Sequence, residues 1–172
     1  MQYNKEEIKM AAIDLSTAGI RIGIAYESVS GTRPTSGYTN IPEPKSIPAM
    51  DEAPSLLETT SLNNEKYKSY IPGLNDLNGG DIAITFNYSE EWADFWDTMY
   101  ETNETNKVSG LRAWIEFYVP GMTDAFFMPV DIVKRGQPGA EVDSVLEVTG
   151  HFTPVGEPDF YTAVNPTDPV SA

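Results

Sequence analysis

The sequence predicts a mainly β fold: an antiparallel β-sandwich or partly open barrel with one flanking α-helix, a long Pro-rich loop and extended terminal arms. The main observation is a repeated alternation of apolar and polar side chains, which is the spacing of half-buried strands. Pro-Gly turns separate the last three alternating runs and predict an antiparallel meander. The alternating runs are residues 20–27, 81–88, 111–119, 124–134 and 141–152.

The flanking helix is predicted at about residues 89–101, directly after the second alternating run. Ser89 suits an N-cap, and the next two residues are glutamates, which the helix dipole favours in a first turn. An apolar stripe at helical spacing is more typical of a core face than of a platform for a sugar or cofactor. We therefore expect this stripe to close one open side of the sheet. Its members are Trp92, Phe95, Trp96 and Met99.

The segments between these elements are predicted to be less regular. Residues 28–54 form a Pro-rich loop, because prolines cannot donate hydrogen bonds to a sheet. A loop of this length inside a domain is usually functional or ordered by a partner. We expect residues 54–64 to contain an extended piece that pairs with a neighbouring segment. Residues 70–74 are predicted to form a turn, and Gly79-Gly80 to break the chain before the next strand.

The length of 172 residues fits one domain. We expect a single β domain over residues 1–155, with the Pro-rich loop inside it. Residues 156–172 contain several prolines and are predicted to be an extended or disordered C-terminal arm. A capping box and apolar residues at helical spacing also predict a short helix over residues 4–15.

The composition is strongly acidic and excludes several classes of function. The chain has 26 Asp and Glu against 11 Lys and Arg, a formal net charge of -15. Such a surface repels the phosphates of nucleic acid rather than binding them. The chain has no Cys, which excludes disulfides and thiolate metal sites. The sequence starts without a secretory signal and has no apolar run near about 20 residues, so a soluble protein is predicted.

No catalytic residue, cofactor site or metal site is predicted. His151 is the only histidine, and it lies within a predicted strand with no nucleophile elbow anywhere in the chain. Glu116 could face Asp131 or Glu147 as the acid and base of a hydrolase. A chain with 26 acids brings such pairs together by chance, so the hydrolase interpretation has the least support.

Several of these features occur in one order: the segment 58–62, the turn at 70–74, Gly79-Gly80 before the strand, the aromatic helix and the meander through Gly150. This order resembles the tail tube (major tail) proteins of long-tailed bacteriophages. The similarity spans about residues 45–155. The resemblance implies a non-enzymatic structural protein of the virion, made in the host cytoplasm, whose hexameric rings stack into a hollow tube.

The resemblance also implies the partners. These are other copies of the chain, a tape-measure protein and other tail proteins, with no membrane and no cofactor. DNA would pass through the tube without specific binding, repelled by an acidic lumen. A subunit contact or the lumen wall is expected on the second face of the third alternating run, which mixes charged and aromatic residues. Those residues are Arg112, Trp114, Glu116 and Tyr118.

The alternative is a monomeric glycan-binding β-sandwich. In that interpretation Trp114 and Tyr118 would stack on sugar rings, and residues 76–81 would hold Ca²⁺. That loop does not match an EF-hand, because its Gly is displaced and Asn87 stands where the motif has Glu. An irregular Ca²⁺ site therefore remains open.

Overall fold

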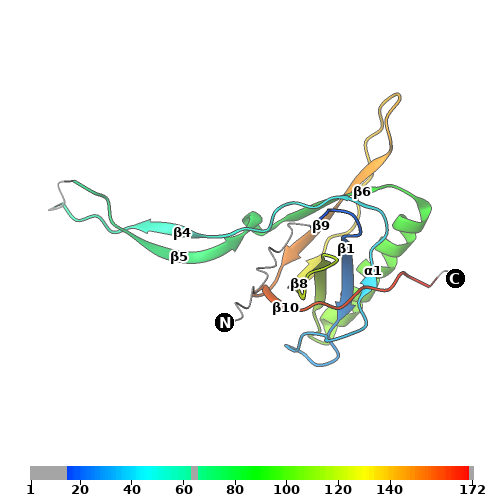
Figure 1. Cartoon of the computed structure of the whole chain (residues 1–172), viewed down its shortest axis with the longest axis horizontal. Helices are drawn as coiled ribbons and strands as arrows, with labels where there is room; N and C mark the ends of the chain where they lie inside the picture. The colour runs from blue at the N-terminus through cyan, green and yellow to red at the C-terminus, as the bar shows by residue number, and fades with distance from the viewer. Residues whose placement is uncertain (1–14, 63–65, 171–172) are drawn as a thin grey trace, which may run out of the picture.

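The fold is a curled antiparallel sheet with one helix packed against it (Figure 1). The computed structural model describes residues 15–62 and 66–170. The strand order in the sheet is β2-β1-β7-β8-β9-β6-β3, and β10 pairs with β8. The predicted mainly β fold with one flanking helix is confirmed, and so is the meander, since β7, β8 and β9 are neighbours. The strands are β1 (Arg21–Tyr26), β2 (Thr39–Asn40), β3 (Pro44–Ser46), β6 (Ile82–Asn87), β7 (Ala113–Tyr118), β8 (Asp124–Ile132), β9 (Glu147–Pro154) and β10 (Asp159–Thr162).

Helix α1 (Glu90–Val108) starts at the predicted position. The Ser89 hydroxyl accepts a hydrogen bond from the backbone N–H of Trp92 at 3.1 Å, which satisfies one of the free N–H groups of the first turn. The helix was predicted to end at about residue 101, and that boundary is wrong. Residues 101–107 are polar and resemble a loop, but they continue the helix to Val108.

A tertiary contact explains the longer helix. Asn103 is buried, and its side-chain amide donates to Asp131 Oδ1 on β8 at 2.7 Å. Lys107 adds an ion pair to the other oxygen of Asp131 at 3.1 Å. The last turn is therefore held to the sheet by polar groups rather than by an apolar stripe. The helix ends before Gly110, which has a φ of 70°, a conformation that glycine adopts at little cost.

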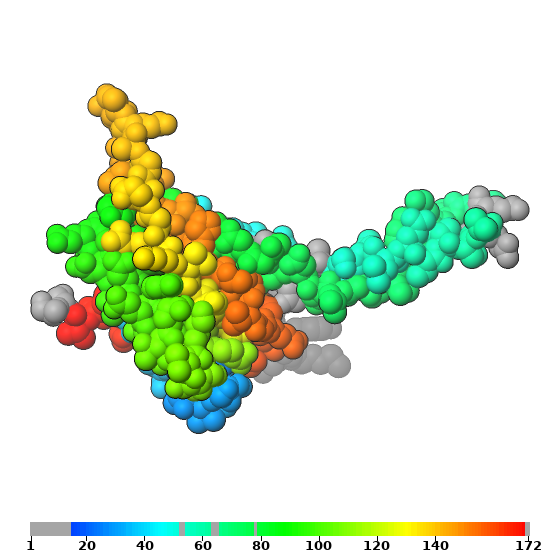
Figure 2. Space-filling view, turned by 180° about the vertical axis from the view of Figure 1, so that it is seen from behind, coloured from blue at the N-terminus to red at the C-terminus, as the bar shows by residue number. Residues whose placement is uncertain are grey.

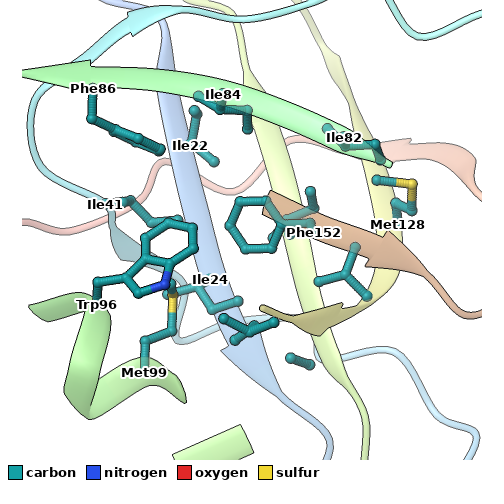
Figure 3. Packing of buried hydrophobic residues seen from close by; sticks show 14 of the residues in the cluster. Ile22, Ile24, Ile41, Ile82, Ile84, Phe86, Trp96, Met99, Met128 and Phe152 are labelled. Atoms are coloured by element: carbon teal, nitrogen blue, oxygen red, sulfur yellow. The ribbon is translucent and has the colours of Figure 1, made fainter. Parts of the chain in front are cut away.

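The main core lies between α1 and the concave face of the sheet (Figure 3). Trp92, Trp96 and Met99 are buried there, and Phe95 is partly buried at the margin. Trp96 packs close to the backbone of β9. A Cβ atom added to Gly150 would lie 2.4 Å from the Trp96 ring, so the ring occupies space that only a glycine leaves free.

A second sheet forms a long hairpin that projects from the body (Figure 1). It consists of β4 (Glu52–Glu58) and β5 (Tyr70–Leu77), followed by the short 3-10 helix η1 (Asn78–Gly80). The extended piece predicted within residues 54–64 is found at residues 52–58, which pair with β5. Both glycines of η1 have positive φ. The predicted turn at 70–74 is wrong, because these residues are strand.

The proline in β5 is compatible with a strand for a simple reason. Pro72 pairs opposite Leu56 in a ribbon of two strands, each of which has one free edge. A proline that faces a free edge removes no hydrogen bond from the ladder. The Pro-rich loop 28–54 is also interrupted, because it contains β2, β3 and the start of β4.

The last predicted strand starts later than expected. Residues 141–146 belong to a second projecting loop between β8 and β9, visible above the body in Figure 1. Strands β8 and β9 pair only over their last few residues, so the chain between them diverges from the sheet. Val142 is fully exposed there, and Asp143 has a φ of 59°. The alternation at 141–146 therefore does not correspond to a half-buried strand.

The helix predicted over residues 4–15 lies almost entirely outside the described residues. Within the described part of the chain, no helix is long and apolar enough to cross a membrane.

Candidate functional site

The hairpin exposes apolar side chains on both of its faces. Leu57 pairs opposite Ile71 on one face, and Leu56 pairs opposite Pro72 on the other. The exposed fractions are 53% for Leu57, 50% for Ile71 and 64% for Leu56. Figure 2 shows the hairpin standing clear of the body. An isolated ribbon of two strands is only marginally stable in water. The described part of the hairpin has no hydrophobic core of its own in which these side chains could be buried.

The end of the hairpin continues this surface. Leu62 and Tyr67 are exposed there, and Leu74 is exposed nearer the body. Lys68 forms an ion pair with Glu58 across the ribbon at 3.2 Å. Exposed apolar groups that are contiguous, rather than scattered singly, are typical of a surface that contacts another macromolecule.

The outer face of α1 is acidic. Its carboxylates are exposed or partly exposed, while the aromatic stripe on the opposite face is buried. One of them, Asp97, accepts from Arg135 Nε at 2.8 Å at the base of the second projecting loop. The acidic residues of the helix are Glu90, Glu91, Asp94, Asp97, Glu101 and Glu104.

The four residues predicted to form a subunit contact or the lumen wall lie on β7 or directly before it. They occupy two different environments. Arg112 and Tyr118 are partly exposed, whereas Trp114 and Glu116 are buried. Trp114 belongs to a second, smaller core on the outer face of the sheet, against which Ala163 and Val164 of the C-terminal segment (residues 163–168) pack. A subunit contact through Trp114 or Glu116 would therefore require this covering segment to move.

The carboxylates considered as the acid and base of a hydrolase each bind a different partner. Glu116 accepts from the backbone N–H of Val164 at 2.8 Å, and Glu147 pairs with Lys45. Asp131 is occupied by the end of α1, as described above. Within residues 15–62 and 66–170, no group of three or more His, Asp or Glu is placed to hold a metal ion.

A buried carboxylate that the sequence did not single out organises the junction of β1 and β7. Glu27 is 3% exposed and accepts four hydrogen bonds, all between 2.8 and 3.1 Å. Its donors are the Trp114 indole, the Arg112 guanidinium and the backbone N–H groups of Gly31 and Arg112. Burial by itself raises the pKa of Glu27, but these hydrogen bonds outweigh it and hold the pKa below its ordinary value.

Replacing Glu27 by alanine is expected to lower the free energy of unfolding by about 3 kcal/mol, because Arg112 and Trp114 lose their buried acceptor. The Glu27 pKa is lower in the folded than in the unfolded chain, so its contribution is complete above pH 4.5 and is lost as the pH falls. Denaturant unfolding at neutral and acidic pH measures both effects. The exposed Glu101→Ala is the control, and an equal loss in the two variants would contradict the role of Glu27.

No family model and no curated protein matches the sequence. Among solved structures, a chain of the six-fold symmetrised anti-feeding prophage (AFP) baseplate matches with a TM-score of 0.52 and 8% identity, covering 83% of this chain and 92% of that chain. A chain from the C6-symmetric tail of an empty GTA particle matches with a TM-score of 0.52 and 11% identity, covering 83% and 96%.

A third structure, the SPP1 tail tube, has a TM-score of 0.49 and 15% identity over 84% of this chain and 78% of that chain. The first two matches span most of both chains, so the likeness extends over most of the fold rather than one motif. This chain therefore shares its fold with a chain of the AFP baseplate and a chain of the GTA tail, in agreement with the resemblance to tail tube proteins found in the sequence.

Proposed function

We propose that this chain is a structural protein of a virion, a subunit of a hexameric ring that stacks into a hollow tail tube. The observation that carries the proposal is the projecting hairpin with apolar side chains on both faces. A ribbon of this kind becomes stable when each of its faces is covered. In a tube, a neighbouring copy of the chain would provide this cover. The six-fold symmetry of two structural neighbours supports the hexameric ring as a proposal.

The energetics of the hairpin favour assembly. Burying a Leu or Ile side chain completely stabilises by roughly 1.5 to 3 kcal/mol, and each copy offers several that are half exposed. A contact between a projecting element of one copy and a different surface of the next is heterologous. Heterologous contacts close into rings or continue as filaments, which are the two levels of organisation in a tube.

The charge supports passage of DNA without binding. We propose that an acidic lumen repels the phosphate backbone, so that DNA does not adhere during transit. The net charge of -15 and the acidic outer face of α1 support this proposal. No catalytic role is proposed, and the expected partners are other copies, a tape-measure protein and other tail proteins. The protein would be made in the host cytoplasm and located in the phage tail.

The division of the chain is part of the proposal. A β domain over residues 1–155 carries the hairpin, and an arm over residues 156–172 follows it. The described part of this arm includes β10, which pairs with β8 in the sheet, and Ala163 and Val164, which pack against the second core. Arg112 and Tyr118 are proposed as contact residues because both keep exposed surface. Trp92, Phe95, Trp96 and Met99 are proposed as the residues that attach the helix to the sheet.

Raising the salt concentration from about 0.05 to 0.5 M is expected to shift the purified protein from monomers to rings or tubes, because salt screens repulsion between acidic copies. Sedimentation velocity and negative-stain microscopy across protein concentrations measure the shift. Monomers under all these conditions, together with binding of sugars or Ca²⁺, would support the glycan-binding alternative instead.

A further inference from the structure

The C-terminal segment, residues 163–168, covers one edge of the sheet. The backbone N–H of Asn40 on β2 donates to the carbonyl of Thr167 at 2.7 Å, and the N–H of Thr167 donates to the carbonyl of Tyr38 at 3.0 Å. Arg21 Nη1 adds a hydrogen bond to the carbonyl of Pro166 at 2.8 Å. The segment thus satisfies backbone groups that an edge strand otherwise leaves open.

Most side chains of this segment stay at least partly exposed. Pro166 is buried against Gly23 and Tyr38, but Thr167 and Asp168 are exposed. Ala163 and Val164 are only partly buried. A segment with few buried apolar contacts opens locally at a lower free energy than the whole domain unfolds.

Glu116 lies beneath the segment and is fully buried. Its Oε1 accepts from the backbone N–H of Val164 at 2.8 Å, while its Oε2 has no hydrogen-bond partner among the described residues. Buried polar atoms are nearly always paired, and an unpaired one costs most when it is charged. The contact to Val164 therefore joins the segment to a carboxylate whose charge is poorly compensated.

The groups that face Glu116 come from β1, β8 and the loop before β2. The residues opposite it on β1 and β8 are Gly23 and Phe127, which do not titrate. The loop before β2 contributes Arg33, whose positive charge acts on Glu116 from a position over the Phe127 ring at 4.5 Å and over the Tyr161 ring of β10 at 4.1 Å. The same loop contributes Tyr38, whose pKa burial raises to about 12, so it is neutral over the physiological range.

We propose that the C-terminal segment is a pH-sensitive latch, which is closed when Glu116 is protonated and loosened when Glu116 is charged. Opening frees the N–H of Asn40 and the carbonyl of Tyr38 at the edge of the sheet. The edge would then be available to pair with another strand. The latch is a property of the single chain and does not depend on the proposed assembly.

The direction of the pH effect follows from burial. Burial raises the pKa of Glu116 from 4.5 to about 7, although the Val164 N–H and the charge of Arg33 lower it. Once the segment opens, Glu116 regains water and its pKa returns toward 4.5. The closed state thus binds the proton more tightly. Closure is most favourable below pH 4.5, weakens as the pH rises to about 7, and is least favourable above that.

Hydrogen exchange read by mass spectrometry on the full chain tests the latch. Exchange in peptides over residues 38–41 and 159–170 is measured at about pH 5.5 and about pH 8, corrected for intrinsic rates, at concentrations where the protein is monomeric. The opening equilibrium constant is expected to rise by about tenfold or more at the higher pH. In Glu116→Gln it is expected to be independent of pH, because the amide is always neutral yet still accepts from Val164.

A second variant and an internal reference complete the test. A Cβ atom added to Gly23 would lie 2.9 Å from Pro166 Cγ, so Gly23→Ala is expected to increase opening at both pH values. Exchange in α1 serves as the reference and is expected to stay unchanged after correction. A pH dependence in Glu116→Gln equal to that of the unmodified protein would overturn the proposal. Stronger protection of the segment at the higher pH would overturn it too.

Discussion

Replacing Trp96 by alanine is expected to lower the free energy of unfolding by about 3 to 5 kcal/mol, the range for removing a large buried aromatic side chain. Trp96 is fully buried, with its ring centroid 5.0 Å from that of Trp92 and 5.1 Å from that of Phe152. Its indole N–H also donates to the carbonyl of Val133 at 3.0 Å. Alanine would leave a cavity between α1 and the sheet and would remove the hydrogen bond to Val133.

Denaturant unfolding followed by circular dichroism measures this loss. Tyr67→Ala is the matched control, because it also removes an aromatic ring but from a side chain that is 84% exposed. It is expected to change stability by less than about 0.5 kcal/mol. If Trp96→Ala left stability unchanged but abolished assembly, α1 would be an interface element, and its assignment to the core would be wrong.

The double variant Leu57→Ser with Ile71→Ser is expected to raise the concentration needed to form the proposed tube, while the monomer stays folded. The two side chains pair across one face of the hairpin, outside both cores. Loss of about 3 kcal/mol of apolar burial per contact would raise the concentration needed for assembly on the order of 100-fold. Sedimentation across a concentration series measures this threshold.

The control for this variant is Val108→Ser, which removes an exposed apolar side chain at the end of α1 rather than on the hairpin. It is expected to assemble like the unmodified protein. Circular dichroism and thermal melting should be nearly the same for all three proteins, since none of the substitutions touches a core. Assembly of the double variant at an unchanged threshold would contradict the role of the hairpin in the tube.

Local sequence patterns predicted the elements whose apolar periodicity does not depend on tertiary contacts. The alternation over residues 20–27 and 81–88 corresponds to β1 and β6. Strand β6 is half-buried as predicted, but β1 is buried on both faces, because Gly23 and Ala25 on its second face are covered by Pro166 and the second core. The start of α1 was also predictable, because Ser89 and the two acids after it act within the first turn. The end of α1 was not, since Asn103 stays helical through a contact with Asp131 on β8.

The functional surfaces were less accessible to sequence reasoning. Residues 70–74 contain a Pro-Gly pair and read as a turn, but their pairing with β4 makes them a strand. Glu27 sits at the polar end of an alternating run, and nothing local indicates that four donors converge on it. The burial of Trp114 and Glu116 depends on the C-terminal segment, which lies dozens of positions away along the chain.

By itself, the sequence determined the mainly β class, the aromatic face of the helix, the acidity and the absence of cysteine chemistry, because periodicity and composition act over a few residues or over the whole chain. Only the tertiary structure decided that the hairpin is a projecting ribbon, that Glu27 and Glu116 are buried, and that the C-terminal segment covers the β2 edge. Each of these depends on pairing between remote segments, and such pairing is specified by packing in three dimensions rather than by local spacing.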